Sequence, residues 1–106
     1  MGQRASEAAA FLKALSHEGR LMILCHLSSG EKSVTELEEL LGARQAAVSQ
    51  QLARLRSDGM VSARRDGKTI HYSIRDPKAA SIMALVYEMF CGPDAKPSLS
   101  AQFIPA

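Results

Sequence analysis

Apolar residues recur at helical spacing in the first 30 residues, and a short polar stretch divides them into two segments. The first segment, residues 5–15, has one stripe made of Ala8, Phe11, Leu12 and Leu15. The second carries Leu21, Leu24, Cys25 and Leu27, and it stops at the Ser-Ser-Gly of residues 28–30. Ser16 stands between them, and serine is a favoured N-cap because its hydroxyl accepts hydrogen bonds from the first backbone N–H groups. We therefore expect two helices, the second capped by Ser16.

Two further helices are predicted between residues 33 and 58, joined by a very short turn at Gly42. Ser33 and Glu36 have the spacing of a capping box, in which each side chain accepts a hydrogen bond from the other residue's backbone. The apolar positions of this third helix, expected to face inward, are Val34, Leu37, Leu40 and Leu41. The fourth helix has Val48, Leu52 and Leu55 on its inner face. Its opposite face carries Gln45, Ser49, Gln50, Ala53 and Arg56.

The spacing of apolar residues changes from helical to alternating after residue 60. Ile70, Tyr72 and Ile74 alternate with polar residues, which is typical of a half-buried strand. Residues 60–65 can form its partner, and Asp66-Gly67 is a two-residue turn of the kind that closes a tight hairpin. Asp76-Pro77 predicts the start of a last helix, since proline at the first helical position loses no hydrogen bond. We expect one domain over residues 1–92 and a flexible C-terminal tail over 93–106.

The composition is that of an ordinary globular chain with locally concentrated positive charge. A chain of 106 residues allows one modest core, so oligomerisation that buries more apolar surface is a reasonable expectation. No apolar run is long enough to span a membrane and the N-terminus does not resemble a signal peptide, so we expect a cytoplasmic protein. The net charge is only +2, but residues 44–75 hold seven basic and two acidic side chains. Such a segment fits a phosphate-binding surface, although charge alone would equally fit a solvated one.

The order of the predicted elements places this charge on two neighbouring elements. A helix, a glycine turn and a second helix that exposes short polar side chains form a helix-turn-helix, and the hairpin that follows forms its wing. The predicted fold is therefore a winged helix-turn-helix, mainly α with a small β-hairpin, in the order α-α-α-α-β-β-α. Side-chain amides and hydroxyls at the start of the fourth helix can read base edges in the major groove. The expected DNA-binding residues are Arg44, Gln45, Ser49, Gln50, Arg54, Arg56, Arg64, Arg65 and Lys68.

Three segments of the chain resemble the ArsR family (ArsR/SmtB-type) of winged-helix bacterial repressors. Residues 15–24 resemble the opening of its second helix, 43–61 its recognition helix and 65–74 its wing. The chain departs from many relatives at Arg44, where they have a serine cap, and at Gln51, where they often have histidine. The resemblance implies a homodimer that binds a palindromic operator in double-stranded DNA and leaves it when an inducer arrives. Apolar faces that fit the dimer interface carry Phe11, Leu12, Leu15, Ile82, Leu85, Val86 and Met89.

Metal-sensing members of that family carry motifs that this chain lacks. Sensors of arsenic, cadmium and lead have a Cys-x-Cys motif in the third helix, whereas residues 34–40 contain no cysteine. Zinc sensors place aspartate, histidine and glutamate ligands on the last helix, which here offers Asp76 and Glu88 but no histidine. Soft-metal and zinc sites need converging thiolates or imidazoles, so we expect neither a metal nor another cofactor.

Two cysteines, Cys25 and Cys91, remain as candidate sensor residues. Free cysteine often packs as a small apolar residue, an interpretation that suits Cys25 on its apolar stripe better than Cys91 at the end of the last helix. One cysteine in each of these helices, without metal motifs, resembles the persulfide- and sulfide-responsive SqrR and BigR branch of the family. That resemblance implies that reactive sulfur species link the two thiols within one protomer, through a disulfide or a longer sulfur chain. A metal or arsenite response and a general thiol-oxidant response stay open as alternatives.

Other function classes have weaker support. The sequence has no nucleophile elbow, phosphate-binding loop or Cys-x-x-Cys motif, so we expect no enzymatic activity. A winged helix that binds protein instead of DNA is the other alternative. It would lack the steep salt dependence that counterion release gives to DNA binding.

Overall fold

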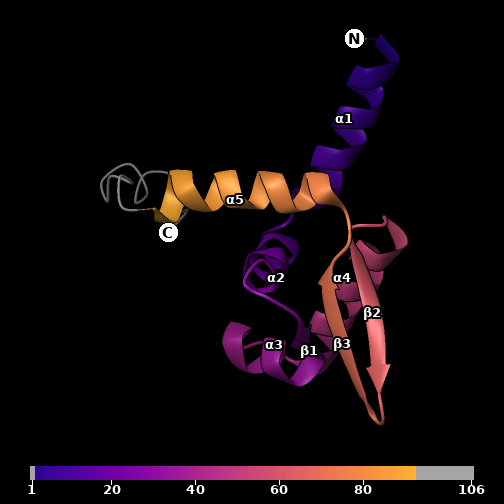
Figure 1. Ribbon diagram of the computed structural model, residues 1–106, viewed down its shortest axis with the longest axis vertical. Coiled ribbons are helices and arrows are strands. Elements are labelled where there is room, and N and C mark those ends of the chain that lie inside the picture. Colours follow the sequence, from indigo (N-terminus) through magenta and orange to yellow (C-terminus); the bar gives the residue numbers. More distant parts are fainter. Residues whose placement is uncertain (1, 93–106) are drawn as a thin grey trace.

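The computed structural model describes residues 2–92, which form five helices and three strands (Figure 1). In chain order these are α1 (Gly2–Leu15), α2 (Glu18–Leu27), β1 (Lys32–Ser33), α3 (Val34–Leu41), α4 (Gln45–Ser57), β2 (Val61–Asp66), β3 (Thr69–Ile74) and α5 (Pro77–Cys91). This is the expected winged helix-turn-helix with one short strand added. The expected tail, residues 93–106, lies outside the described residues. No helix in the described range is long and apolar enough to cross a membrane.

One core joins the end of α1, α2, α3, α4, β2 and the start of α5. Leu24, Leu37, Leu52 and Leu55 are completely buried at its centre. The inner face expected for α4 is confirmed, because Val48, Leu52 and Leu55 are all buried. α3 differs from expectation at Leu40, which is 49% exposed. Each residue of a helix turns by about 100°, so Leu40 lies on the opposite flank of Leu37 from Val34 and Leu41.

Local signals at the helix ends are confirmed in α3 and α5 and wrong at α2. Ser33 and Glu36 form the expected capping box, and the Asp76 side chain caps α5 with Pro77 in its first turn. Ser16 does not cap α2: its backbone N–H continues α1 by donating to the Lys13 carbonyl. His17 takes the cap position with an extended backbone, and its Nδ1 accepts from the N–H groups of Gly19 and Arg20. The cap is therefore the residue directly before the helix.

The sheet has the order β1-β3-β2, so the predicted hairpin gains a third strand from the segment before α3. Lys32 pairs with Tyr72, and Ser33 with His71. The hairpin turn lies one residue later than predicted, because Asp66 pairs with Thr69 and leaves Gly67 and Lys68 as the two turn residues. Gly67 has a φ of +64°, a left-handed conformation that glycine adopts without strain.

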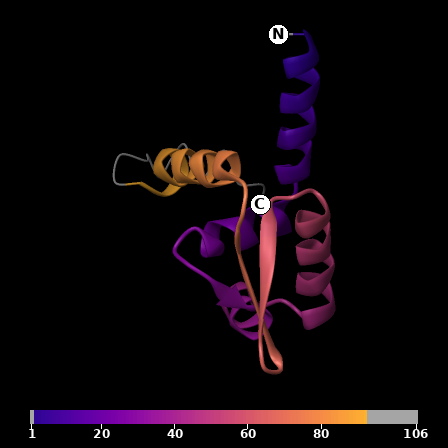
Figure 2. The ribbon, with the colours of Figure 1, turned by 45° about the vertical axis from the view of Figure 1, so that its right-hand side comes forward.

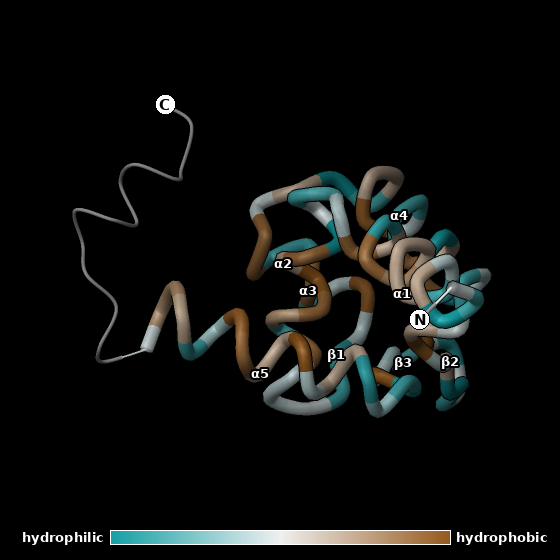
Figure 3. Tube along the Cα trace, turned by 90° about the horizontal axis from the view of Figure 1, so that it is seen from above, coloured by the Kyte–Doolittle hydropathy of each residue, from teal (hydrophilic) through white to brown (hydrophobic). Residues whose placement is uncertain are grey.

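α1 and α5 project away from this body. In Figures 1 and 2 α1 points away from the end of the molecule that carries the tip of the β2–β3 hairpin. Among the fourteen residues of α1 only Ala14 and Leu15 are buried. α5 packs its first half on the core through Ala79 and Met83, and its second half extends beyond α2 and α3 (Figure 3).

Candidate nucleic-acid interface and cysteine pair

The exposed face of α4 presents the polar side chains expected to contact DNA. Gln45, Ser49 and Gln50 are exposed, while the three leucine and valine positions behind them fix the helix to the core. Arg44 is the N-cap residue, and its side chain makes no capping hydrogen bond. The first N–H groups of α4, at the positive end of the helix, therefore lack the bond that a serine cap would accept from them.

The tip of the wing lies next to the start of α4. Gln45 and Lys68 line one shallow depression of about 200 Å³ together with Thr35 of α3. The start of α3, the start of α4 and the tip of the wing therefore border one depression, which is also lined by the apolar residues Val34 and Ile70. Lys68 stands at the turn and is exposed.

Three of the expected DNA-binding side chains already have partners within the chain. Arg54 forms an ion pair with Asp58 on the next turn of the helix, with 3.0 Å between Nε and Oδ2. Arg64 donates two hydrogen bonds to Glu31, and this pairing lowers the pKa of the Glu31 carboxyl and raises that of Arg64. Arg65 donates from Nε to the Gly67 carbonyl at 3.1 Å. Arg44, Arg56 and Lys68 make no side-chain hydrogen bond or ion pair with other residues between 2 and 92.

Arg20 and Gln51 form a link that no pattern in the sequence predicted. Arg20 donates from Nε to the Ala14 carbonyl at 2.7 Å and from a terminal nitrogen to Gln51 Oε1 at 3.1 Å. These two bonds connect the end of α1 and the start of α2 to the middle of α4. The only signal in the sequence was that Gln51 departs from the histidine of many relatives.

The two cysteines lie on neighbouring helices, α2 and α5, which pack against each other. Both thiols are free, Cys25 half-buried against the core and Cys91 exposed at the end of α5. Burial raises the pKa of the Cys25 thiol, and a negative charge on Cys91 raises it further. The fold therefore places two cysteines that are 66 positions apart in the sequence on helices that contact each other.

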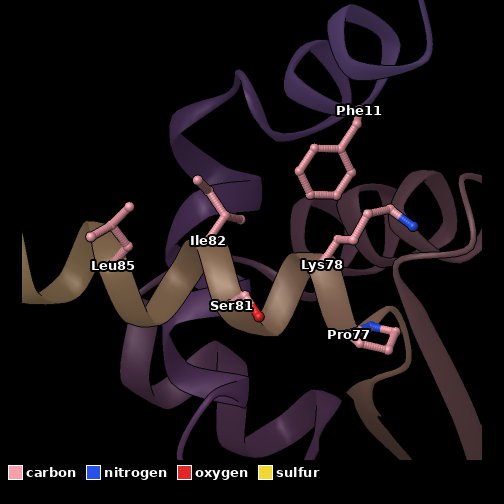
Figure 4. A pocket seen from close by; sticks show the side chains of 6 residues that line it. All are labelled: Phe11, Pro77, Lys78, Ser81, Ile82 and Leu85. Atoms are coloured by element: carbon pink, nitrogen blue, oxygen red, sulfur yellow. The ribbon is translucent and has the colours of Figure 1, made fainter. Parts of the chain in front are cut away.

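Large apolar side chains gather on α1 and α5, where the sequence predicted a dimer interface. Leu12, Leu85 and Met89 are each more than half exposed. Phe11 of α1 faces Ile82 and Leu85 of α5 across a groove of about 390 Å³, which Pro77, Lys78 and Ser81 complete (Figure 4). Val86 is half-buried. Leu15 differs from the others because it is 4% exposed and belongs to the core of the protomer, so it has little surface left for a partner.

Within residues 2–92, no three histidine, cysteine, aspartate or glutamate side chains converge in a way that could hold a metal ion. Asp76, which the sequence raised as a potential ligand, caps α5 instead. Its carboxylate accepts from the Lys78 backbone at 2.9 Å and pairs with the Lys78 ammonium at 3.5 Å.

Comparisons with known proteins agree with this geometry. The family model described as bacterial regulatory protein, arsR family, matches residues 17–63. The chain is 47% identical over 94 residues to the biofilm growth-associated repressor of Agrobacterium fabrum, covering 89% of this chain and 80% of that protein. The solved structure of the transcriptional repressor BigR from Xylella fastidiosa matches with a TM-score of 0.79 and 45% identity, over 91% of this chain and 95% of that one. Reduced HlyU from Vibrio cholerae matches with a TM-score of 0.83 and 37% identity, over 86% and 96%.

Proposed function

Because this chain belongs to the arsR family of bacterial regulatory proteins, we propose that it is a homodimeric repressor that leaves its operator when reactive sulfur species join Cys25 to Cys91. DNA-binding regulation of transcription, rather than catalysis, is the activity that its family membership establishes. Two of its relatives are named as repressors, which supports repression as its mode of regulation. A regulator of this kind works on the chromosome, in the cytoplasm.

The operator contacts divide into base-reading and phosphate-binding side chains. Gln45, Ser49 and Gln50 read base edges from the exposed face of α4. The phosphates are bound by the basic side chains of α4 and the wing, namely Arg44, Arg54, Arg56, Arg65 and Lys68. Arg54 reaches a phosphate by exchanging Asp58 for it, which costs little because an exposed ion pair of this kind contributes only about 0.3–0.5 kcal/mol.

The partner on the apolar faces of α1 and α5 is a second copy of the chain. An isolated helix of about 12–15 residues is marginal in water, and α1 buries only its last two residues in its own protomer. Its stability therefore depends on a surface outside the protomer. Leu12 on α1 and Leu85 and Met89 on α5 supply apolar surface on both elements, as a self-complementary interface requires. A dimer of this kind also matches two half-sites in a palindromic operator.

The sulfur chemistry balances with an organic persulfide, RS–SH, as the oxidant. The thiolate of one cysteine attacks the outer sulfur of RS–SH and becomes a protein persulfide, and RSH leaves. The thiolate of the other cysteine attacks the sulfur bonded to the protein, and HS⁻ leaves and takes a proton. Two thiols and one RS–SH thus become one disulfide, one RSH and one H₂S. Each further RS–SH inserts one sulfur atom into the bridge and releases one RSH.

The observation that carries this part of the proposal is that the two free cysteines lie on α2 and α5, which pack against each other. A direct disulfide requires Cα atoms within roughly 7 Å, whereas a longer sulfur chain accepts a wider separation. Cys91 is exposed whereas Cys25 is half-buried, so an oxidant in solution reaches the Cys91 thiol first. α2 also packs against α4, the recognition helix. A bridge that fixes α2 to α5 therefore changes the position of a helix on which α4 rests.

The test compares three oxidants on reduced protein and measures intact mass and operator binding. The probe is a DNA duplex that the wild-type protein selects from a randomised library. Glutathione persulfide is expected to form an intramolecular Cys25–Cys91 bridge and to release the duplex, and glutathione disulfide and hydrogen peroxide are expected to act far less. The Cys25→Ser and Cys91→Ser variants, which serve as matched controls, should stay bound.

Three results would change the proposal. Release by all three oxidants would indicate a general thiol-oxidant sensor. Release of the double serine variant by persulfide, or release of the wild type by arsenite or Zn²⁺ but not by persulfide, would refute the cysteine bridge as the signal.

A further inference from the structure

The wing carries one arginine whose side chain turns back to the body of the protein. Arg64 donates from Nε to Glu31 Oε2 at 3.1 Å and from a terminal nitrogen to Glu31 Oε1 at 2.7 Å. Two parallel bonds between a guanidinium fork and a carboxylate fix the direction of both side chains, which a single ion pair does not do. We propose that Arg64 is a positioning residue of the wing, held by Glu31, and does not bind a phosphate. This inference rests on the proposed binding of DNA.

The Glu31–Arg64 pair spans the whole sheet. Arg64 lies on β2, and its neighbour across the hairpin is His71 of β3, which pairs on its other side with Ser33 of β1. Glu31 directly precedes β1 on the far edge. The side-chain bonds therefore cross β3 diagonally, from the residue before β1 to Arg64, which is level with Ser33 at the end of β1. Beyond this level the hairpin continues without a third strand.

Glu31 is a fixed anchor because the loop around it is held from both sides. Ser28 and Ser29 close the end of α2 by donating from their hydroxyls to the carbonyls of Cys25 and His26. Lys32 donates back to the Ser29 hydroxyl at 3.2 Å, and its backbone belongs to β1. Gly30 has a φ of +140°, which residues with a Cβ rarely adopt, so the course of the chain into Glu31 depends on glycine at this position.

Within residues 2–92, no other side-chain hydrogen bond or ion pair ties the distal wing to the body. From Arg64 to Ile70 every residue is exposed, and Ile70, the apolar residue nearest the tip, is 41% exposed. A two-stranded hairpin without a buried face is only marginally ordered in water. The pair with Glu31 is thus the last polar attachment that sets the direction of the tip, where Arg65 and Lys68 meet the phosphates.

The charges distinguish this role from phosphate binding. Arg64 and Glu31 neutralise each other, so the pair adds nothing to the counterions released when DNA binds. Lys68, in contrast, has no side-chain partner in residues 2–92 and contributes a full positive charge. Replacing Lys68 should therefore reduce the salt dependence of operator binding, whereas replacing Arg64 should leave it unchanged.

The first experiment measures the affinity for the selected duplex over a series of salt concentrations. Lys68→Ala should reduce the slope of log affinity against log salt by about 0.9 for each phosphate that the lysine neutralises in the wild type. Arg64→Ala should weaken binding about two- to fivefold, as expected for an exposed ion pair, and leave this slope unchanged. Glu31→Gln should weaken binding to the same extent, although removing a negative charge would by itself strengthen the attraction to DNA.

The second experiment exchanges the two charges. A Glu31→Arg/Arg64→Glu protein keeps the pair with reversed polarity, so its affinity should return to within about twofold of the wild type. Arg64→Glu alone should bind weakly. Circular dichroism and the oligomeric state of each variant show whether it is folded. The exchanged protein and Arg64→Glu change only exposed side chains.

Each of three results would overturn the inference: a salt slope lowered by Arg64→Ala as much as by Lys68→Ala, wild-type affinity of Arg64→Ala, or failure of the exchanged pair to restore binding. If the proposed DNA binding were wrong, the wild-type protein would select no duplex. That result differs from all three results above.

Discussion

Replacing Gln51 with alanine tests whether the link from Arg20 holds the recognition helix in place. The bond from Arg20 to Gln51 Oε1 is 3.1 Å long and half-buried, and its donor is charged. Hydrogen bonds to charged groups contribute about 1.5–3 kcal/mol, and the partial exposure of this pair places it at the lower end. We therefore expect Gln51→Ala to lower the free energy of unfolding by about 1.5 kcal/mol. Arg20→Ala also removes the 2.7 Å bond to the Ala14 carbonyl, so it should lower that free energy by about 3 kcal/mol.

Urea denaturation followed by circular dichroism, at one fixed protein concentration, measures these changes. Gln50→Ala is the matched control, because Gln50 is the neighbouring residue on α4 and is exposed. Its stability should stay within about 0.5 kcal/mol of the wild type. In operator binding Gln50→Ala should be the more damaging of the two variants. Removing the base contact of Gln50 should cost about 1–3 kcal/mol of binding free energy, whereas Gln51→Ala should act only through the position of α4.

Two results would refute this reasoning. One is a Gln51→Ala protein as stable as the Gln50→Ala control. The other is additivity in the double variant: if the losses of stability from Arg20→Ala and Gln51→Ala add in full, the two side chains do not interact.

Three further predictions concern the cysteines, the dimer and the helix caps. Because Cys91 contributes to the raised pKa of Cys25, Cys91→Ser should lower that pKa. Iodoacetamide should then alkylate Cys25 faster at a fixed, mildly alkaline pH. An unchanged rate would show that the thiols do not interact. Leu12→Asp places a charge on the proposed interface and should convert the dimer to a monomer in sedimentation experiments, and a persistent dimer would contradict the interface. Ser33→Ala breaks the capping box and should lower the free energy of unfolding, measured by urea denaturation, by about 1–2 kcal/mol. Ser16→Ala should stay within about 0.5 kcal/mol of the wild type, because Ser16 does not cap α2. Equal losses would contradict the assignment of the caps.

The helix-turn-helix could be predicted because its signals are local. The capping box of Ser33 and Glu36 begins α3, Gly42 ends it in a left-handed conformation, and the repeat of Val48, Leu52 and Leu55 sets the inner face of α4. Each signal involves residues within about two turns of helix. The tertiary structure preserved all three because they agree with the core that they build.

The elements that the sequence did not reveal depend on contacts between distant residues. β1 is only two residues long, so it has no periodicity of its own and exists because β3 pairs with it. The hairpin turn moved to Gly67 and Lys68 because pairing of Asp66 with Thr69 extends the ladder by one residue. Leu15 fitted the interface by its position on the stripe, yet the packing of the end of α1 places it in the core.

The same distinction divides the functional residues. The helix-turn-helix, the wing, the positive charge on both and the cysteine in each of α2 and α5 could all be read from the sequence. They follow from composition and from spacing along one element. The folded chain was needed to show that Arg64 is paired with Glu31, that Arg20 reaches Gln51, and that the helices carrying Cys25 and Cys91 pack together. Those relations join residues 31 to 66 positions apart, and no local pattern encodes a contact that the core alone creates.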